Sequence, residues 1–212
     1  MDVRMSTRDT TGQNPAPRSL ASADLPERVR KTLEIALSTV YEELDTPLGL
    51  LLAEFEQELF RLAGQAGSQV LQSGYMQTLR SFRLSRADLV PHFMLSLEAG
   101  LAGIRSAPAA AAAVVETRSL NFSNLSLVET SVVDEGMILR EIGSRQEGRA
   151  KLSLHLLGQR FGVLAESPGL DSEHIPLGPQ ALCRSIRMAA TALELDYESR
   201  LLLYGIFDRI VM

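Results

Sequence analysis

The chain's only cysteine, Cys183, lies nine residues after His174 and ten after Glu173, in the stretch DSEHIPLGPQALCRS. A thiol beside an imidazole that a carboxylate orients is the arrangement of a cysteine nucleophile. Closeness in the sequence does not supply that geometry. Pro179 suits the first turn of a helix that places Cys183 on an apolar face, where a free cysteine acts as a small hydrophobic side chain. We therefore predict a loop and a helix start, assign no catalytic residue, and keep a Cys/His enzyme as one alternative.

The histidines do not form a metal-binding pattern. His92, His155 and His174 show no H-x-x-x-H or H-E-x-x-H spacing, and one cysteine excludes cysteine-rich zinc and iron–sulfur frameworks. The phosphate-binding G-x-x-x-x-G-K-[ST] motif and the G-x-S-x-G nucleophile motif are also absent. We predict no metal and no cofactor.

Two charged groups are the remaining candidate binding residues. The acidic group is Glu129, Asp134 and Glu135, near a predicted helix start. It either complements the helix dipole or forms a docking face for a basic partner. The loop residues Glu173 and His174 are a second candidate contact.

The basic group could clamp a phosphate of a cyclic dinucleotide or another nucleotide. Its members are Arg140, Arg145, Arg149 and Arg160, with Lys151 among them. Glu141 and Glu147 are interleaved with these cations, which favours a solvated face of i,i+4 ion pairs, Glu141–Arg145 and Glu147–Lys151.

The elements that must position these residues are amphipathic helices, so we predict an all-α fold, a bundle-like array in two helical units. Residues 1–24 carry few large apolar side chains, which predicts a disordered tail. An N-terminal helical unit over 25–104 follows, then an Ala-rich linker over 105–119 and a C-terminal helical unit over 120–212. Within the first unit we predict a helix break at Asp45–Pro47 and a helix restart near Asp88 that accommodates Pro91. The final helix ends on apolar residues without a cap, so we expect the native chain to continue past Met212.

The bulk composition narrows the partners. The net charge of −5 argues against binding of a nucleic-acid backbone. No run of about 18 apolar residues occurs, so we expect no membrane span. The single cysteine suits a reducing cytoplasm.

Several blocks resemble a known bacterial family. They are LSLVE…DE, LGQRFGVL, DSEHIPLGPQALCRSIR and RLLLYGIFDRIVM in the second half, and PLGLLLAEFEQELFRLA and YMQTLRSFRLSRADLVPHFMLSL in the first. Their order resembles the family known as domain of unknown function 1631. The resemblance implies a cytoplasmic, largely helical proteobacterial protein without an established chemistry. Some relatives carry the label thymidine phosphorylase, but the Gly/Thr-rich phosphate signature of that enzyme has no match here.

These observations favour a non-enzymatic helical interaction or regulatory module that binds a protein partner, with a homo-oligomer also open. The alternatives are a nucleotide-responsive effector using the arginines, and the Cys/His enzyme.

Overall fold

The computed structural model describes residues 19–105 and 127–212, with side chains in the second range described from Asp134 onward. Every regular element in those ranges is a helix, so the predicted all-α class is confirmed. The predicted Ala-rich linker lies outside the described residues, apart from Arg105.

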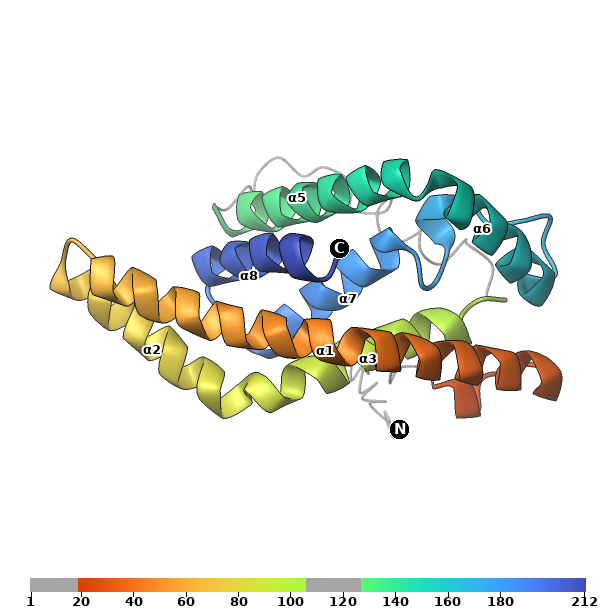
Figure 1. Cartoon of the computed structure of the whole chain (residues 1–212), viewed down its shortest axis with the longest axis horizontal. Helices are drawn as coiled ribbons and strands as arrows, with labels where there is room; N and C mark the ends of the chain where they lie inside the picture. Colours follow the sequence, from red (N-terminus) through yellow and green to blue (C-terminus); the bar gives the residue numbers. More distant parts are fainter. Residues whose placement is uncertain (1–18, 106–126) are drawn as a thin grey trace, which may run out of the picture.

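The helices are stacked in three layers (Figure 1). One outer layer holds α1 (Glu27–Gln65), α2 (Gln69–Ser85) and α3 (Leu89–Ala102). The other outer layer holds α5 (Leu127–Arg149) and α6 (Lys151–Ala165). Between them lie α7 (Pro179–Ala192), which packs on α3 and α5, and α8 (Tyr197–Ile210), which packs on α1 and α5. The two halves of the chain therefore pack on each other.

The longest helix, α1, corrects one prediction. It runs for 39 residues straight through Pro47, where we predicted a break. Proline removes one hydrogen bond from a helix interior. However, the apolar side chains keep the same three- and four-residue phase on both sides of Pro47, so one apolar face continues past it. The buried and half-buried side chains of this face are Leu33, Leu37, Val40, Leu44, Leu48, Leu51, Leu52, Phe55 and Leu59.

Polar side chains or prolines mark several of the other helix starts. Ser68 caps α2 by accepting a hydrogen bond from the Leu71 amide (3.3 Å), and Asp196 caps α8 by accepting one from the Ser199 amide (2.9 Å). Pro179 occupies the first turn of α7, as predicted. The helix restart near Asp88 is also confirmed, since Asp88 directly precedes α3.

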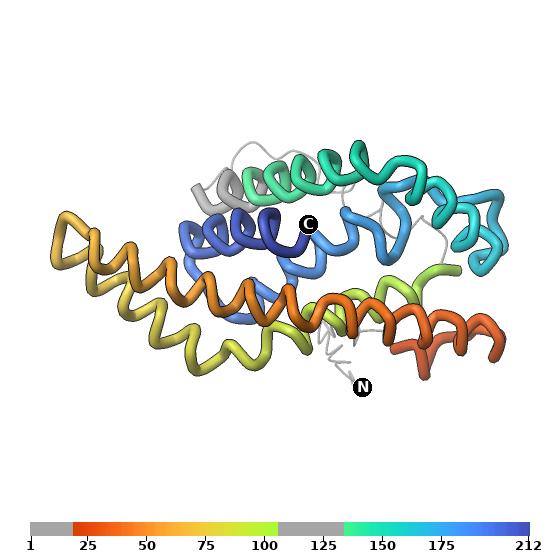
Figure 2. The backbone as a smooth tube through the Cα atoms, in the orientation of Figure 1, coloured from red at the N-terminus to blue at the C-terminus, as the bar shows by residue number. Residues whose placement is uncertain are grey.

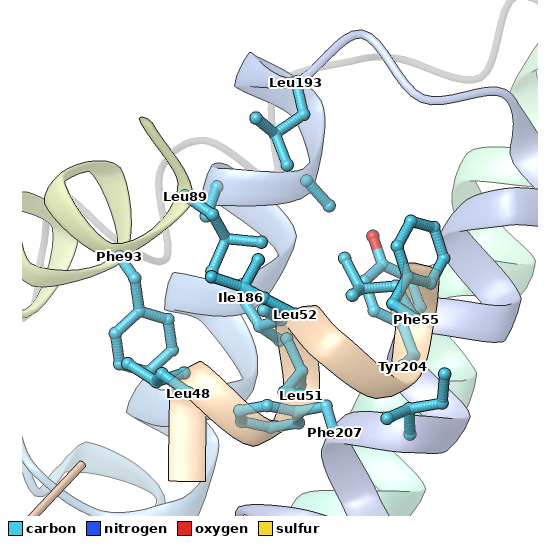
Figure 3. Close-up of a cluster of buried hydrophobic side chains, with 14 of the residues drawn as sticks. Leu48, Leu51, Leu52, Phe55, Leu89, Phe93, Ile186, Leu193, Tyr204 and Phe207 are labelled. Carbon is cyan, nitrogen blue, oxygen red and sulfur yellow. The ribbon is translucent and has the colours of Figure 1, made fainter. Parts of the chain in front are cut away.

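The main core draws on both halves. Figure 3 shows Leu51 and Phe55 of α1, Phe93 of α3, Ile186 of α7 and Phe207 of α8 converging in one cluster. The tubes of α7 and α8 lie between the outer helices in Figure 2 as well. Where α7 crosses α3, the Ser185 hydroxyl donates a hydrogen bond to the Ser96 hydroxyl (Oγ–Oγ 3.0 Å).

A second, smaller cluster forms at the other end of the molecule. It consists of Leu20, Leu25, Leu33, Leu101, Ala102, Leu154, Phe161 and Ile175. Leu20 belongs to a short 3₁₀ turn, η1 (Leu20–Ser22). The Leu20 amide donates a hydrogen bond to the Glu98 carboxylate (2.9 Å). Residues 19–24 are thus structured, where the predicted disordered tail extended to residue 24. The rest of that tail lies outside the described residues.

Candidate functional site

The Cys183 thiol is enclosed in the main core, and only 2% of the residue is exposed. Burial raises its pKa to about 12, and the nearby negative charge of Asp208 adds to the shift. His174 lies on a separate 3₁₀ turn, η4 (Ser172–His174), where it is exposed. Since the nucleophile of a cysteine enzyme is the thiolate, this arrangement does not form a Cys/His pair.

The loop that carries Glu173 and His174 rests on two glycines of α6. A Cβ at Gly158 would overlap the backbone of Leu170, and a Cβ at Gly162 would lie 2.5 Å from the Cα of Gly169. The Leu170 amide donates to the Gly158 carbonyl (3.1 Å), and the Ser167 amide donates to the Gly162 carbonyl (2.9 Å). The close approach therefore depends on the absence of side chains at both glycines.

A cavity of about 490 Å³ lies between this loop and the end of α3. Its polar lining includes Arg105, Ser167, Asp171 and His174. Arg105 already donates to the Leu164 carbonyl (2.9 Å) and pairs with Glu166 (2.9 Å). Of the two loop residues predicted as a contact site, His174 lines this cavity and Glu173 does not.

The docking-face alternative for the acidic group does not hold for Glu135, because this residue is buried. Glu135 is 3% exposed and forms an ion pair with Arg200 of α8 (Oε1–Nη2 2.6 Å). The Tyr204 hydroxyl donates to its other carboxylate oxygen (3.2 Å). Asp134 is exposed beside a shallow groove, and the Glu129 side chain lies outside the described residues.

The four arginines are not gathered into a phosphate clamp. Arg145 pairs with Asp208 of α8 (3.0 Å), and Arg140 lines the groove that also contains Asp134 and Glu141. Arg149 donates to the Gln146 side chain (3.4 Å), and Arg160 is exposed on α6. Neither predicted pair, Glu141–Arg145 or Glu147–Lys151, is among the ion pairs of the described residues.

Glu147 turns inward instead of toward Lys151. Its Oε1 atom is buried without a hydrogen-bond partner. Burial and the neighbouring charge of Glu173 raise the pKa of its carboxyl group. Among the described residues, no group of three or more His, Cys, Asp or Glu side chains is placed to hold a metal ion.

The outward side of α6 is the most regular exposed apolar surface near these residues. Leu152, Leu156, Gln159 and Val163 are all exposed and follow one another at steps of four, three and four. Leu152 and Val163 are 73% and 77% exposed, and Leu156 is 48% exposed. This spacing is that of a coiled-coil seam, and we call these four residues the α6 seam.

Cations flank the α6 seam. Arg149, Lys151 and Arg160 are exposed, and none of them is in an ion pair in the described part of the chain. Residues 148–165 contain no Asp or Glu, although the whole chain has a net charge of −5.

Comparison with known proteins decides the family. Residues 28–212 match the family model described as "Protein of unknown function (DUF1631) N-terminal domain". The chain belongs to this family. No curated protein and no solved structure matches the chain. The resemblance found in the sequence blocks is confirmed, and no residue role comes with it.

The sequence of this DUF1631 domain does not by itself distinguish the α6 seam from the other apolar sides of the helix. The signal was present as Leu152, Leu156 and Val163, but Leu154, Leu157 and Phe161 make the helix apolar on other sides too. Periodicity alone therefore did not tell which side faces the core. The pair Gly158 and Gly162 marks the side covered by the loop, but that side lies between the core side and the α6 seam and does not tell them apart. No helix in the described ranges is long and apolar enough to cross a bilayer.

Proposed function

We propose that this DUF1631 domain is a non-enzymatic helical module that binds a protein partner through the α6 seam. The observation that carries the proposal is the exposure of three large aliphatic side chains at coiled-coil spacing on one helix. A partner helix that covers this seam removes their apolar surface from water, which is favourable by about 25 cal/mol per Å².

Regularity separates the α6 seam from the other exposed apolar residues. Leu84 of α2 is 84% exposed, Ile35 of α1 is 68% exposed, and Val70 and Leu71 of α2 are 80% and 55% exposed, but none of them recurs with another exposed large apolar residue at steps of three or four. Scattered apolar side chains of this kind are normal on protein surfaces. The α6 seam instead presents its side chains over the whole length of a helix that is already held in place. Leu154 and Phe161 anchor the opposite side of α6 in the smaller core cluster. A partner would therefore meet a preformed surface, which lowers the entropic cost of binding.

The proposal replaces the acidic group as the contact surface, because Glu135 is committed to Arg200. It keeps the expected protein partner and the cytoplasmic bacterial setting that the family resemblance and the single cysteine favour. The nucleotide-responsive alternative loses its geometric support, since Arg140 and Arg145 lie beside acidic groups.

Comparative capture from the native extract tests this proposal. The full chain is used as bait, and the double variant Leu156→Asn/Val163→Asn is run beside it. Leu84→Asn is the control, because it removes from α2 an aliphatic side chain that is more exposed (84%) than Leu156 (48%) or Val163 (77%). We expect a specific partner to be retained by wild type and Leu84→Asn and lost by the double variant. Equal retention by all three would reject the α6 seam as the contact site.

A further inference from the structure

We infer that the partner segment is an acidic amphipathic helix, which lies along the α6 seam with its carboxylates against Lys151 and Arg160. This inference rests on the proposed function and adds the chemistry of the partner.

Charge is the first argument. The exposed cations beside the α6 seam have no internal ion-pair partner in the described residues, and the helix carries no acidic side chain. In coiled coils, charged residues that flank the apolar seam select the partner and its orientation. Arg160 directly follows the seam residue Gln159, and Lys151 directly precedes Leu152. Glutamates that flank the apolar positions of a partner helix would meet both cations.

The polar residue within the α6 seam is the second argument. Gln159 occupies a seam position between Leu156 and Val163, and its side-chain amide lies 3.1 Å from the ring Nε2 of His155. A single polar side chain at such a position commonly fixes the register of a helix pair at some cost in stability. The Gln159 amide would also lower the affinity of this surface for the acyl chains of a membrane, because acyl chains offer no hydrogen-bond partner. Gln159 therefore favours a helix over an anionic membrane.

A second copy of the chain is also disfavoured at this surface. Antiparallel pairing of two α6 helices would bring Arg160 of one copy toward the Lys151 end of the other. Like charges placed together in this way reduce affinity.

The direct test uses two designed helical peptides of about three heptads, both with leucines at the seam positions. One has glutamates at the flanking positions, and the other has lysines. Each is labelled and titrated with the full chain in a fluorescence polarisation assay. We expect the glutamate peptide to bind at least about tenfold more tightly, and the preference to shrink as salt is raised.

Two pairs of variants locate the effect. Lys151→Glu/Arg160→Glu should reverse the peptide preference, whereas Arg80→Glu on α2 should leave it unchanged. Leu156→Asn/Val163→Asn should weaken binding of the glutamate peptide by about tenfold or more, whereas Leu84→Asn should not. All substituted side chains are exposed, and far-UV circular dichroism checks that the helices remain.

The outcomes separate this inference from the proposed function. Equal affinity for both peptides, with loss of both in the seam variant, overturns the acidic partner and leaves the α6 seam as a contact site. No binding of either peptide, together with undiminished native capture by the seam variant, overturns both. Binding to phosphatidylserine vesicles that the same variants abolish, without peptide preference, assigns the surface to a membrane instead. A dimer in sedimentation velocity that the seam variant dissociates assigns it to a second copy.

Discussion

Glu135 of α5 and Arg200 of α8 form an ion pair of 2.6 Å at the junction of two helices, with the carboxylate almost entirely buried. Arg200 also donates to the Leu195 carbonyl, and Tyr204 donates to the second carboxylate oxygen. The pair therefore ties the loop before α8, α8 itself and α5 together.

Breaking only one side of this pair should be costly. Arg200→Met leaves a buried carboxylate without its cation, and we expect the free energy of unfolding to fall by about 3 kcal/mol. In the double variant Glu135→Leu/Arg200→Met no charge is stranded, so much of that loss should be recovered. Denaturant unfolding of wild type, both single variants and the double variant measures the coupling. Simple additivity of the two single losses would show that the pair does not act as a unit.

The contact between α6 and the loop should tolerate no side chain. Gly158→Ala or Gly162→Ala forces the Leu170 or Gly169 backbone away, so we expect each to lower the free energy of unfolding by about 1–3 kcal/mol. Gly148→Ala is the matched control, because a Cβ there meets nothing within 4 Å. That change should stabilise α5 by about 0.5–1 kcal/mol. Equal effects at all three glycines would contradict the close loop packing.

The buried thiol predicts both low reactivity and an alkaline loss of stability. At neutral pH, alkylation of Cys183 in the folded protein should be at least about a hundredfold slower than in the unfolded protein. Because the pKa of the thiol rises from 9.0 to about 12 on folding, the protonated thiol contributes fully to the free energy of unfolding below pH 9. This contribution is lost as pH rises toward 12. The free energy of unfolding should therefore decline over this window, and the decline should be shallower in Cys183→Ala. Parallel pH profiles would contradict this assignment.

Glu147 predicts a pH effect at the acidic end. The pKa of its carboxyl group is raised on folding above the ordinary value of 4.5. The protonated carboxyl group therefore contributes fully to the free energy of unfolding below pH 4.5, and this contribution is lost as pH rises through the pKa of the folded state. Glu147→Gln should accordingly be more stable than wild type at pH 7, and the gain should vanish below pH 4.5. Glu141→Gln, an exposed change on the same helix, is the matched control. Thermal unfolding at both pH values provides the comparison, and a gain that persists in acid would refute the explanation.

The sequence predicted where helices start better than it predicted the contacts between side chains that lie far apart in the chain. Ser68, Pro179 and Asp196 act within a few residues, so the starts of α2, α7 and α8 follow from them. Pro47 gave a wrong break because the tertiary packing of α1 outweighs one local preference. The ion pair of Glu135 was not predicted, since nothing near it in the sequence reveals Arg200, which is 65 residues away. The burial of Cys183, in contrast, followed from its position beside Leu182 on an apolar helix face.

The most direct test of the central claim is site-specific photo-cross-linking in the native extract. A photoreactive phenylalanine is placed at position 156 in the α6 seam, or at position 84 on α2 as the control, in the full chain. A helical module that binds a partner through the α6 seam predicts one discrete cross-linked protein from position 156, none from position 84, and loss of the product when Val163→Asn is added. The same products from both positions, or no product from position 156, would contradict the α6 seam as the functional surface.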